Sequence, residues 1–239
     1  MKKILHTSSS RGYAAHGWLS SFHTFSFASY YEPTRMHFGA LRVLNDDTVS
    51  GGMGFGKHPH DNMEIVSIPL SGDLEHQDSM GNKTVITQGE VQIMSAGTGI
   101  YHSEKNKNSH EQVKFLQIWV FPKVKNIQPR YDQKAFDIAG RQNTFQTVVS
   151  PIGTQDDGVK MNQDAWFSLI RLEAGKSANY ALHLPKNGVY AFVLSGSVTI
   201  ANETLAARDG LGITEATSFD LTAESETEVL LMEVPMALN

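Results

Sequence analysis

The chain has 239 residues, of which 40% are hydrophobic, and this is enough for a real core in one large domain or two modest ones. It has no cysteine, which excludes disulfides, thiolate metal sites, iron–sulfur clusters and cysteine nucleophiles. The net charge of −5 comes from interspersed acidic and basic residues without a Lys/Arg cluster, so we expect no direct nucleic-acid partner.

The first residues of the chain were compared with export signals to predict where in the cell the protein is located. Lys2 and Lys3 are followed by Ile4 and Leu5, as in an export signal, but a polar run begins at Thr7 where an apolar stretch should continue. No window of the sequence approaches the roughly 20 consecutive apolar residues that a membrane-spanning helix needs. We therefore expect a cytoplasmic protein without a membrane partner.

Short apolar or alternating runs, separated by Gly, Asn, Asp and Pro, recur along the whole chain. This pattern is typical of an all-β sandwich or barrel, and no long helical periodicity competes with it. Residues 79–83 lie between two runs and carry the Gly-Asn chemistry of a hairpin turn. The expected strands are 41–44, 64–70, 73–78, 89–95, 113–121, 165–172, 188–194, 198–201, 210–214 and 228–234.

Two pairs of candidate ligands have the spacing i, i+2: His58 with His60, and His102 with Glu104. In a β-strand this spacing puts two side chains on the same face, and glycine-rich sequence before each pair lets the backbone turn close to a site. Each pair alone also fits hydrogen-bonded loop histidines or a local polar contact. Two same-face pairs together favour a metal site of three imidazoles and one carboxylate.

The strand that follows the first pair indicates where these ligands point. The even-numbered face of His58 and His60 continues through Val66, Ile68 and Leu70, which are apolar. Apolar residues at alternate positions belong inside a sheet sandwich or barrel. The ligands are therefore expected to point inward.

Other residues near the candidate ligands have less specific patterns. His76 and Asp78 come just before the turn and are interpreted as exposed strand positions. Aromatic, Met and Gln residues on or near the ligand-bearing strands are expected to form pocket walls, although side chains of these types usually just pack. These residues are Met53, Phe55, Met94, Gln117 and Trp119.

A weak internal repeat divides the chain into two similar halves. Residues 68–74 resemble residues 192–198, and each copy has the pattern of a strand, a glycine turn and a strand. The polar stretch 125–161, with several Pro and Gly residues, is interpreted as a connection. We place the boundary near residue 135, which predicts domains 1–135 and 136–239.

The second half lacks equivalents of the ligands. At the offset of the repeat, the four candidate ligands correspond to Leu182, Leu184, Glu226 and Glu228, which make a poor transition-metal site. The two glutamates are interpreted as solvated strand-edge charges, and His183 as a packed or surface residue. The second half is therefore predicted to have the scaffold without the metal.

Six segments of the first half carry a resemblance to a known family. They are residues 16–19, 23–27, 41–47, 54–60, 75–82 and 95–104, including Gly-Phe-Gly-Lys-His-Pro-His at 54–60 and Gly-Ile-Tyr-His-Ser-Glu at 99–104. The chain resembles the pirin family of bicupins, in particular the bacterial pirin-like quercetin 2,3-dioxygenases. The resemblance implies two β-barrel cupin domains (double-stranded β-helix, or jelly roll) in tandem, an N-terminal one with a metal and a C-terminal one without ligands. The second half matches chiefly in its strand pattern.

The resemblance also implies a ligand set, and this agrees with the four residues found from spacing: His58, His60, His102 and Glu104. In many cupins a glutamate shortly after the His-x-His pair is itself a ligand. Glu64 stands there, and we expect it near the site without being a ligand. Such a set suits one divalent transition metal, with iron as the first expectation and manganese, cobalt, nickel, copper or zinc as alternatives.

The implied activity is cleavage of a flavonol such as quercetin with O2 and release of carbon monoxide. Our hypothesis is that Glu104, the one carboxylate among the four residues, takes the proton of the flavonol 3-hydroxyl and is thus the catalytic residue. The alternative is a non-catalytic, metal-binding and redox-responsive regulator of the pirin type, which would need a protein partner. A plain small-molecule-binding cupin would instead bind its ligand without a metal.

Overall fold

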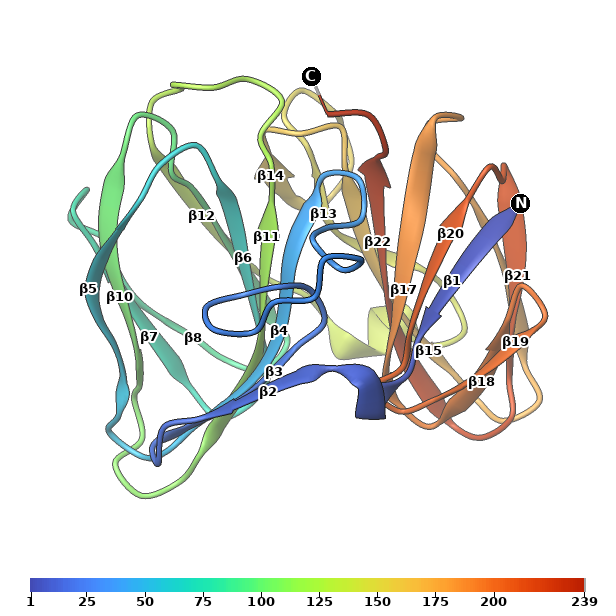
Figure 1. The fold of residues 1–239 in the computed structure, drawn as a ribbon, viewed down its shortest axis with the longest axis horizontal. Coiled ribbons are helices and arrows are strands. Elements are labelled where there is room, and N and C mark those ends of the chain that lie inside the picture. The colour runs from blue at the N-terminus through green and yellow to red at the C-terminus, as the bar shows by residue number, and fades with distance from the viewer. Residues whose placement is uncertain (239) are drawn as a thin grey trace.

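The computed structural model describes residues 1–238 and has two lobes built almost entirely of β-strands (Figure 1). The strands up to residue 135 are β1 (Lys2–His6), β2 (Gly12–Ala15), β3 (Leu19–His23), β4 (Leu41–Val49), β5 (Gly54–His60), β6 (Glu64–Ser71), β7 (Leu74–Asp78), β8 (Lys83–Ile86), β9 (Glu90–Ser95), β10 (Ile100–Asn106), β11 (Val113–Val120) and β12 (Arg130–Ala135). Later in the chain come β13 (Gln146–Pro151), β14 (Val159–Met161), β15 (Trp166–Leu172), β16 (Ser177–Ala181), β17 (Asn187–Ser195), β18 (Ser197–Ile200), β19 (Glu203–Ala206), β20 (Gly210–Thr214), β21 (Ser218–Ala223) and β22 (Thr227–Pro235). Two short 3-10 helices, η1 (Ser8–Ser10) and η2 (Ile138–Arg141), complete the described elements.

Each lobe consists of one seven-stranded sheet and one four-stranded sheet. In the first lobe the orders are β12-β9-β6-β11-β4-β3-β2 and β5-β10-β7-β8. In the second they are β1-β20-β17-β22-β15-β13-β14 and β16-β21-β18-β19. The strand pairs are antiparallel except for β13 with β14. The all-β expectation of two similar lobes is confirmed.

The ten strands expected from the sequence all have counterparts, whereas several others were missed. The ligand-bearing strand β5 contains Gly54, Gly56 and Pro59, residue types that are depleted in strands, and so it gives no strand signal of its own. The strand β10 is mostly polar. The predicted turn is confirmed, since the backbone N–H of Asp78 donates to the carbonyl of Asn82 across it, at 3.0 Å.

The two faces of β6 overturn one prediction. Val66 and Ile68, expected inside the barrel with the ligands, instead belong to an apolar cluster that also contains Phe167 and Leu230 from the second lobe. The odd-numbered face points into the first barrel, where the Ser67 hydroxyl donates to Glu104. Because β6 is buried on both faces, an apolar run in its sequence could not tell one face from the other.

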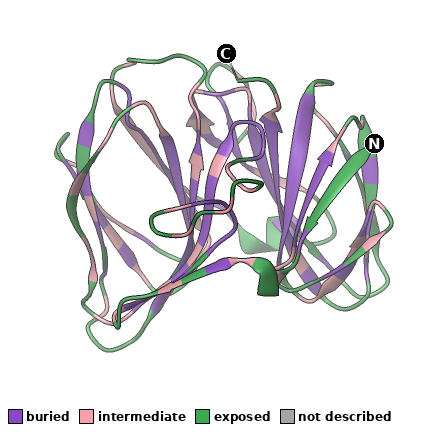
Figure 2. Ribbon diagram, viewed as in Figure 1, coloured by how far each residue is buried: buried purple, intermediate pink, exposed green. Residues whose placement is uncertain are grey.

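The shared cluster joins the lobes through their seven-stranded sheets, and Figure 2 shows buried segments concentrated in the strands between them. It combines β4, β6 and β11 of the first lobe with β13, β15, β17 and β22 of the second. A separate apolar cluster fills the second barrel between its own two sheets. The interior of the first barrel has only two small apolar clusters, which leaves room for polar side chains.

Chain order and spatial order differ at the N-terminus. The strand β1 pairs with β20, with Lys2 opposite Thr214 and His6 opposite Gly210, so it extends the sheet of the second lobe (Figure 1). The chain then crosses to the first lobe through η1 and β2. The boundary at residues 135 and 136 stays a prediction, with β12 on the sheet of the first lobe and β13 on that of the second.

Candidate metal centre

Two adjacent strands bring the predicted ligands together. The strands β5 and β10 are antiparallel neighbours in the four-stranded sheet, and their register places His58 directly opposite His102. His60 lies opposite Ile100, two residues along β10. Cross-strand neighbours have Cβ atoms only about 5 Å apart, so one strand pair can present several ligands to one ion. A register shift follows between His102 and Glu104, and it places Glu104 opposite Phe55.

His58, His60 and His102 form one compact group. Each offers a ring nitrogen that lies within 4.8 Å of the others, and the ring centroids are 4.5 to 4.9 Å apart. Neither ring nitrogen of the buried His102 has a hydrogen-bond partner among the described residues. The His58 Nδ1–H donates to the Gly56 carbonyl at 2.7 Å, which leaves Nε2 as the free acceptor.

The environment keeps two of these imidazoles neutral. Burial, followed by the charge of His58, lowers the pKa of His60 to about 4 and that of His102 to about 2. A metal ion binds the neutral imidazole, and buried polar atoms without partners are rare in folded proteins. The residues therefore fit a transition metal held on histidine nitrogen.

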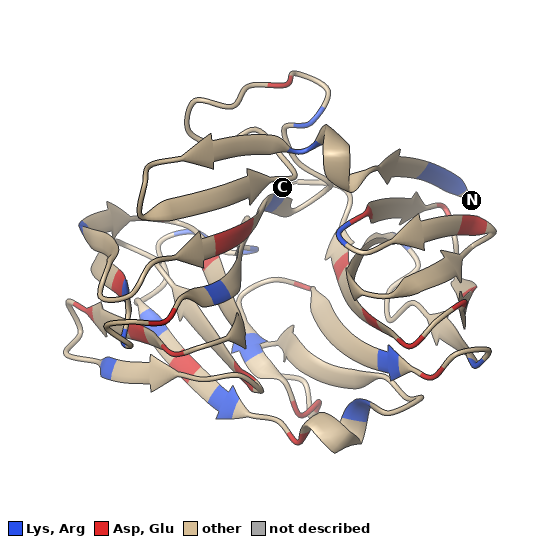
Figure 3. Cartoon of the chain, turned by 90° about the horizontal axis from the view of Figure 1, so that it is seen from below, with Lys and Arg blue, Asp and Glu red and all other residues tan. Residues whose placement is uncertain are grey.

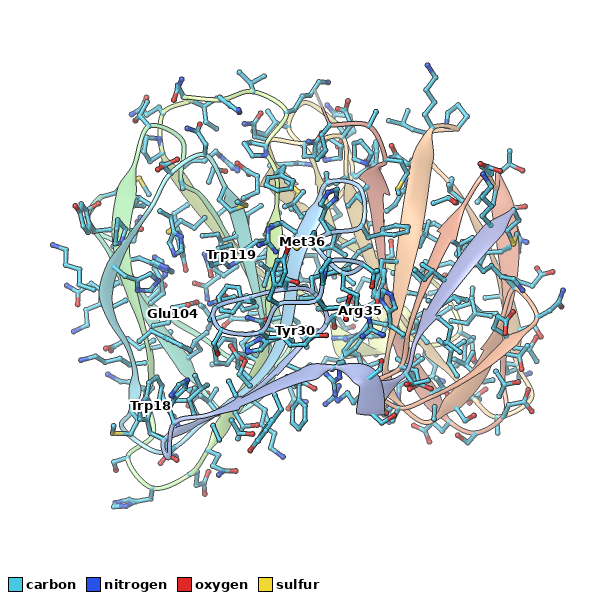
Figure 4. The ribbon with its side chains drawn as sticks, viewed as in Figure 1. Trp18, Tyr30, Arg35, Met36, Glu104 and Trp119 are labelled. Atoms are coloured by element: carbon cyan, nitrogen blue, oxygen red, sulfur yellow. The ribbon has the colours of Figure 1, made fainter. Side chains whose placement is uncertain are left out.

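Glu104 lies next to this group, deep in the barrel (Figure 4). Its carboxylate is held from the opposite sheet: the Ser67 hydroxyl donates to Oε1 at 2.9 Å, and the Gln117 amide donates to Oε2 at 2.5 Å. Burial raises the pKa of Glu104. Glu104 is not one of the three residues that share the 4.8 Å group, so its role as a fourth ligand stays a prediction.

The sequence interpretation of His76 and Asp78 was wrong. Both are buried, on β7, whose register sets Asp78 opposite His102 and His76 opposite Glu104. The His76 ring packs 5.4 Å from that of His102, and its Nε2 lies 3.1 Å from an Asp78 oxygen. Burial acts to raise the pKa of Asp78, but hydrogen bonds from Asn82 and His76 lower it. The signal was present, because this pair has the same i, i+2 spacing as the ligands.

Glu64 is buried, but it serves a different contact from the one expected. Its Oε2 accepts hydrogen bonds from the Ser95 hydroxyl at 2.7 Å and from the backbone N–H of Asn162, in the second lobe, at 3.0 Å. Burial raises its pKa. Glu64 thus links the two lobes and takes no part in the histidine group.

A cavity of about 230 Å³ reaches into the first barrel as far as Gln117, the residue that holds Glu104. Of the predicted walls, Phe55 and Gln117 line it, joined by Trp18 and Phe27. Trp119 packs edge-on against His60, with ring centroids 4.9 Å apart, and Figure 4 shows it in the same lobe as Glu104.

Trp119 and the remaining two predicted walls, Met94 and Met53, do not line this cavity. Met94 is fully buried in the apolar cluster around Ile65, and Met53 is 44% exposed at the surface. Sequence analysis also missed Asp47 and His23, which supply polar atoms to the cavity lining. Neither residue has a ligand-like spacing that could have revealed it.

Among residues 1–238, the second barrel has no comparable group of ligands. His183 has partners that the sequence did not predict: it stacks on Trp166 with ring centroids 4.5 Å apart, and its Nδ1 lies 2.9 Å from a carboxylate oxygen of the buried Glu233. Glu226 pairs with Arg171 at the surface, whereas Glu228 pairs with the buried Arg141. Only Glu226 fits the interpretation as a solvated charge.

Comparison with known proteins decides the family. The pirin family model matches residues 5–120, and the model of the quercetinase C-terminal cupin domain matches residues 147–234. The chain belongs to the pirin family. The resemblance noted in the sequence and the prediction of a bicupin are both confirmed.

Several relatives of this pirin cover nearly the whole chain. Quercetin 2,3-dioxygenase of Escherichia coli strain K12 is 44% identical, over 97% of this chain and 98% of the relative. A pirin-like protein of Caulobacter vibrioides is 40% identical, over 93% and 95%. The crystal structure of the bacterial pirin YhhW of E. coli in complex with nickel(II) is 43% identical, covers 99% of this chain and 100% of that one, and has a TM-score of 0.93.

Two further observations concern partners. No helix among residues 1–238 is long and apolar enough to cross a membrane. Lys and Arg residues are distributed along the strands and loops of both lobes, among Asp and Glu residues (Figure 3).

Proposed function

We propose that the first barrel binds one divalent transition metal through His58, His60 and His102, with Glu104 as a fourth ligand, and cleaves flavonols such as quercetin with O2, releasing carbon monoxide. The observation that carries the proposal is the group of three imidazoles with free ring nitrogens beside a buried carboxylate. The E. coli relative named quercetin 2,3-dioxygenase supports this reaction class.

The surrounding residues suit a planar aromatic substrate. The cavity lined by Trp18, Phe27 and Phe55 leads to Gln117, which touches Glu104. Aromatic rings bind such substrates through offset or edge-on packing and exclude water from them. The substrate would enter along these rings with its hydroxyl groups toward the polar end of the cavity.

Glu104 is proposed to take the proton of the flavonol 3-hydroxyl. When bound, the metal supplies a Lewis acid that makes a coordinated hydroxyl more acidic. The hydrogen bonds from Ser67 and Gln117 fix the carboxylate in one orientation while each oxygen keeps a further lone pair for the proton. Glu104 is the one carboxylate on β5 and β10, so no other acidic side chain of this strand pair competes for the proton.

For the metal itself we propose iron first, with manganese, cobalt, nickel, copper and zinc as alternatives. The nitrogen-rich set binds all of these ions, since imidazole suits most late transition metals. Nickel is the ion in the structure of the E. coli relative.

The test is carbon monoxide release and oxygen uptake with quercetin under air. Protein would be reconstituted separately with each metal, beside a His58→Ala control. We expect turnover that depends on the metal and is lost in the control. Stoichiometric metal binding without carbon monoxide from any metal would contradict the dioxygenase and support the redox-responsive regulatory role, with a protein partner, in its place.

The proton-accepting role has its own test. Glu104→Gln keeps the size of the side chain and can still bind Ser67, so metal content should stay near that of the wild type while kcat falls by about 10² or more. Metal content by mass spectrometry and kcat with quercetin are measured on the same samples. Equal losses of metal and kcat would show that Glu104 acts as a ligand alone.

A further inference from the structure

The cavity in the first barrel has a polar end whose residues have no role in the proposed reaction. Two adjacent strands form this end: Asn45 and Asp47 lie on the same face of β4. Their register partners on β3 are His23 and Ser21. All four side chains are buried, and all four residues line the cavity. Among the described residues that line it, Asp47 is the one acidic residue and none is Lys or Arg.

Hydrogen bonds within the polar end leave three of its atoms free. The Ser21 hydroxyl donates to Asp47 Oδ1. The His23 Nδ1–H donates to Asn45 Oδ1 at 2.9 Å. Asp47 Oδ2, Asn45 Nδ2 and His23 Nε2 have no hydrogen-bond partner among the described residues. They differ from an enclosed partnerless atom such as Trp119 Nε1, because each keeps accessible surface, and this surface faces the cavity. A ligand in the cavity can therefore reach them.

The polar end suits a hydroxyl group. A hydroxyl both donates and accepts, so it can donate to the Asp47 carboxylate and accept from the Asn45 amide. An ammonium group only donates, which leaves the amide without a partner, and an anionic group meets the charge of Asp47 without a cation to offset it. Two neighbouring hydroxyls on one ring satisfy both residues at once.

The other walls of the cavity suit the ring that carries these hydroxyls. The side chains of Trp18, Phe27 and Phe55 line the cavity, and aromatic rings pack on the face or edge of another ring. A sugar ring would bring its hydroxyls to the polar end as well, but it would turn further hydroxyls toward these apolar walls. The lining as a whole therefore fits a hydroxylated aromatic ring.

The polar end is one strand away from the residue that holds Glu104. In the pairing of β4 with β11, Asn45 lies opposite Gln117, whose amide donates to Glu104 Oε2. Opposite residues in a sheet have Cβ atoms about 5 Å apart. Figure 4 shows Trp18, from the cavity wall, in the same lobe as Glu104. A flavonol can thus place its 3-hydroxyl near Glu104 and its outer ring at the polar end.

We propose that Asp47 and Asn45 select a flavonol whose outer ring, ring B, has two adjacent hydroxyl groups. One hydroxyl donates to Asp47 Oδ2, and the other accepts from Asn45 Nδ2. Quercetin belongs to this class, because its ring B is a catechol. The inference rests on the proposed function in taking a flavonol as the substrate. Asp47 determines specificity, whereas the proton of the 3-hydroxyl goes to Glu104.

The test compares three flavonols that differ in ring B alone: quercetin has two adjacent hydroxyls there, kaempferol has one and galangin has none. Dissociation constants are measured by fluorescence titration of the zinc-loaded full chain under nitrogen, without oxygen for turnover. The pH is 8, above the pKa of about 7 of Asp47. We expect quercetin to bind at least about tenfold more tightly than galangin, with kaempferol between them, since a hydrogen bond to a charged group contributes this much. Equal affinities, or no binding of any of the three, would overturn the proposal.

Two variants of Asp47 test its part in this preference. Asp47→Ala removes the acceptor and should reduce the preference for quercetin over galangin at least about fivefold, while galangin itself binds within about twofold of the wild type. If Asp47→Ala does not fold, Asp47→Asn decides. Its amide oxygen still accepts but has no charge, so the preference should fall at least about threefold. An unchanged preference in either folded variant contradicts the proposal.

Glu64→Gln is the matched control. Glu64 is also a buried carboxylate of the first lobe that accepts from a serine hydroxyl, but it lies outside the cavity. This variant should keep the wild-type preference for quercetin. A loss as large as that in Asp47→Ala would show that the preference depends on the fold of the lobe and not on contact with Asp47, and would overturn the proposal.

The titrations are independent of carbon monoxide release. A preference for quercetin that depends on Asp47 supports the proposal even if no carbon monoxide is formed, and the absence of carbon monoxide then contradicts the proposed reaction alone. Carbon monoxide release with the same kcat/KM from all three flavonols, in the wild type and in Asp47→Ala, would support the reaction and overturn the specificity.

Discussion

Asp47 shows how far the interior of the first barrel departs from an ordinary core. It is 98% buried on β4, and the Ser21 hydroxyl donates to its carboxylate. Burial raises the pKa of Asp47 to about 7, although the hydrogen bond from Ser21 acts to lower it. Glu104 on the facing sheet adds to this effect through its negative charge. A carboxylate in this position lowers the free energy of unfolding at neutral pH, and it forms part of the polar wall of the cavity.

The Asp47→Asn variant should therefore be more stable than the wild type at high pH. The unfolded carboxyl releases its proton near pH 3.8 and the folded one near 7, so the folded state holds more protons in between and its stability falls as the pH rises through this window. The variant lacks this fall. Its advantage should grow from near zero at pH 4 to about 2–4 kcal/mol at pH 8.

Urea unfolding of both proteins in the presence of a chelator measures this difference in the free energy of unfolding. The chelator is needed because a bound cation nearby would change the charge that Asp47 meets. A difference between the two proteins that does not vary with pH would show that Asp47 is ionised throughout.

Single residues also mark how far the sequence could predict the site. The i, i+2 pairs identified His58, His60, His102 and Glu104 because ligand types at strand spacing are informative without a structure. The same spacing at His76 was set aside, since only the register of β7 against β10 shows that this strand faces inward. Whether the side chain of Glu64 points into the first barrel or toward the second lobe depends on which face of β6 meets that lobe. The sequence does not show this, because β6 is buried on both faces.

At the scale of the element, the pairing of β5 with β10 positions the histidine group. Gly54 begins β5, where it faces the strand partner: a Cβ atom there would lie 2.3 Å from the Glu104 carbonyl oxygen and 2.5 Å from the Lys105 Cα. Both are backbone atoms, which cannot move aside as a flexible side chain can. Gly56, two residues further along β5, has no atom within 4 Å of such a Cβ. The two glycines therefore form a matched pair.

Gly54→Ala should push β5 away from β10 and separate His58 from His102. We expect a loss of about 2–3 kcal/mol in the free energy of unfolding and a decrease in metal affinity of about tenfold or more. Gly56→Ala should leave both within error of the wild type. Metal titration and chemical denaturation of the two variants provide the comparison, and similar behaviour of the two would show that the strand contact does not position the ligands.

The elements themselves were predictable to different degrees. Strands with apolar alternation, such as β11 and β22, were found because burial of one or both faces leaves its pattern in the sequence. The strand β5 was missed, because its Gly and Pro residues have low strand propensity and are present for the close strand contact and the site. The crossing of β1 to the second sheet is a long-range pairing that no local pattern specifies.

At the scale of the whole molecule, the shared core makes the two lobes one structure. The cluster that joins the seven-stranded sheets contains fully buried side chains from both lobes, among them Leu116 and Leu230, and β1 and Glu64 add further links. The repeat in the sequence correctly indicated two similar halves. It could not indicate this interface, because the residues that form it look like ordinary strand-core residues of each half.

A shared core predicts that damage to one lobe destabilises the site in the other. Leu230→Ala removes fully buried side-chain volume from β22 and should cost about 2–5 kcal/mol, which lowers Tm by about 5–15 °C in a chain of this size. The measurement uses a protein whose Trp18 and Trp119 are replaced by Phe, so that its tryptophan fluorescence reports on Trp166 in the second lobe. Because the lobes unfold together, the midpoint temperature of metal release from the first lobe should fall by the same amount as the midpoint temperature of the Trp166 fluorescence change. If the variant released metal at the same midpoint temperature as the parent protein while only its Trp166 midpoint fell, each lobe would be stabilised by its own core and the contact between the lobes would contribute little.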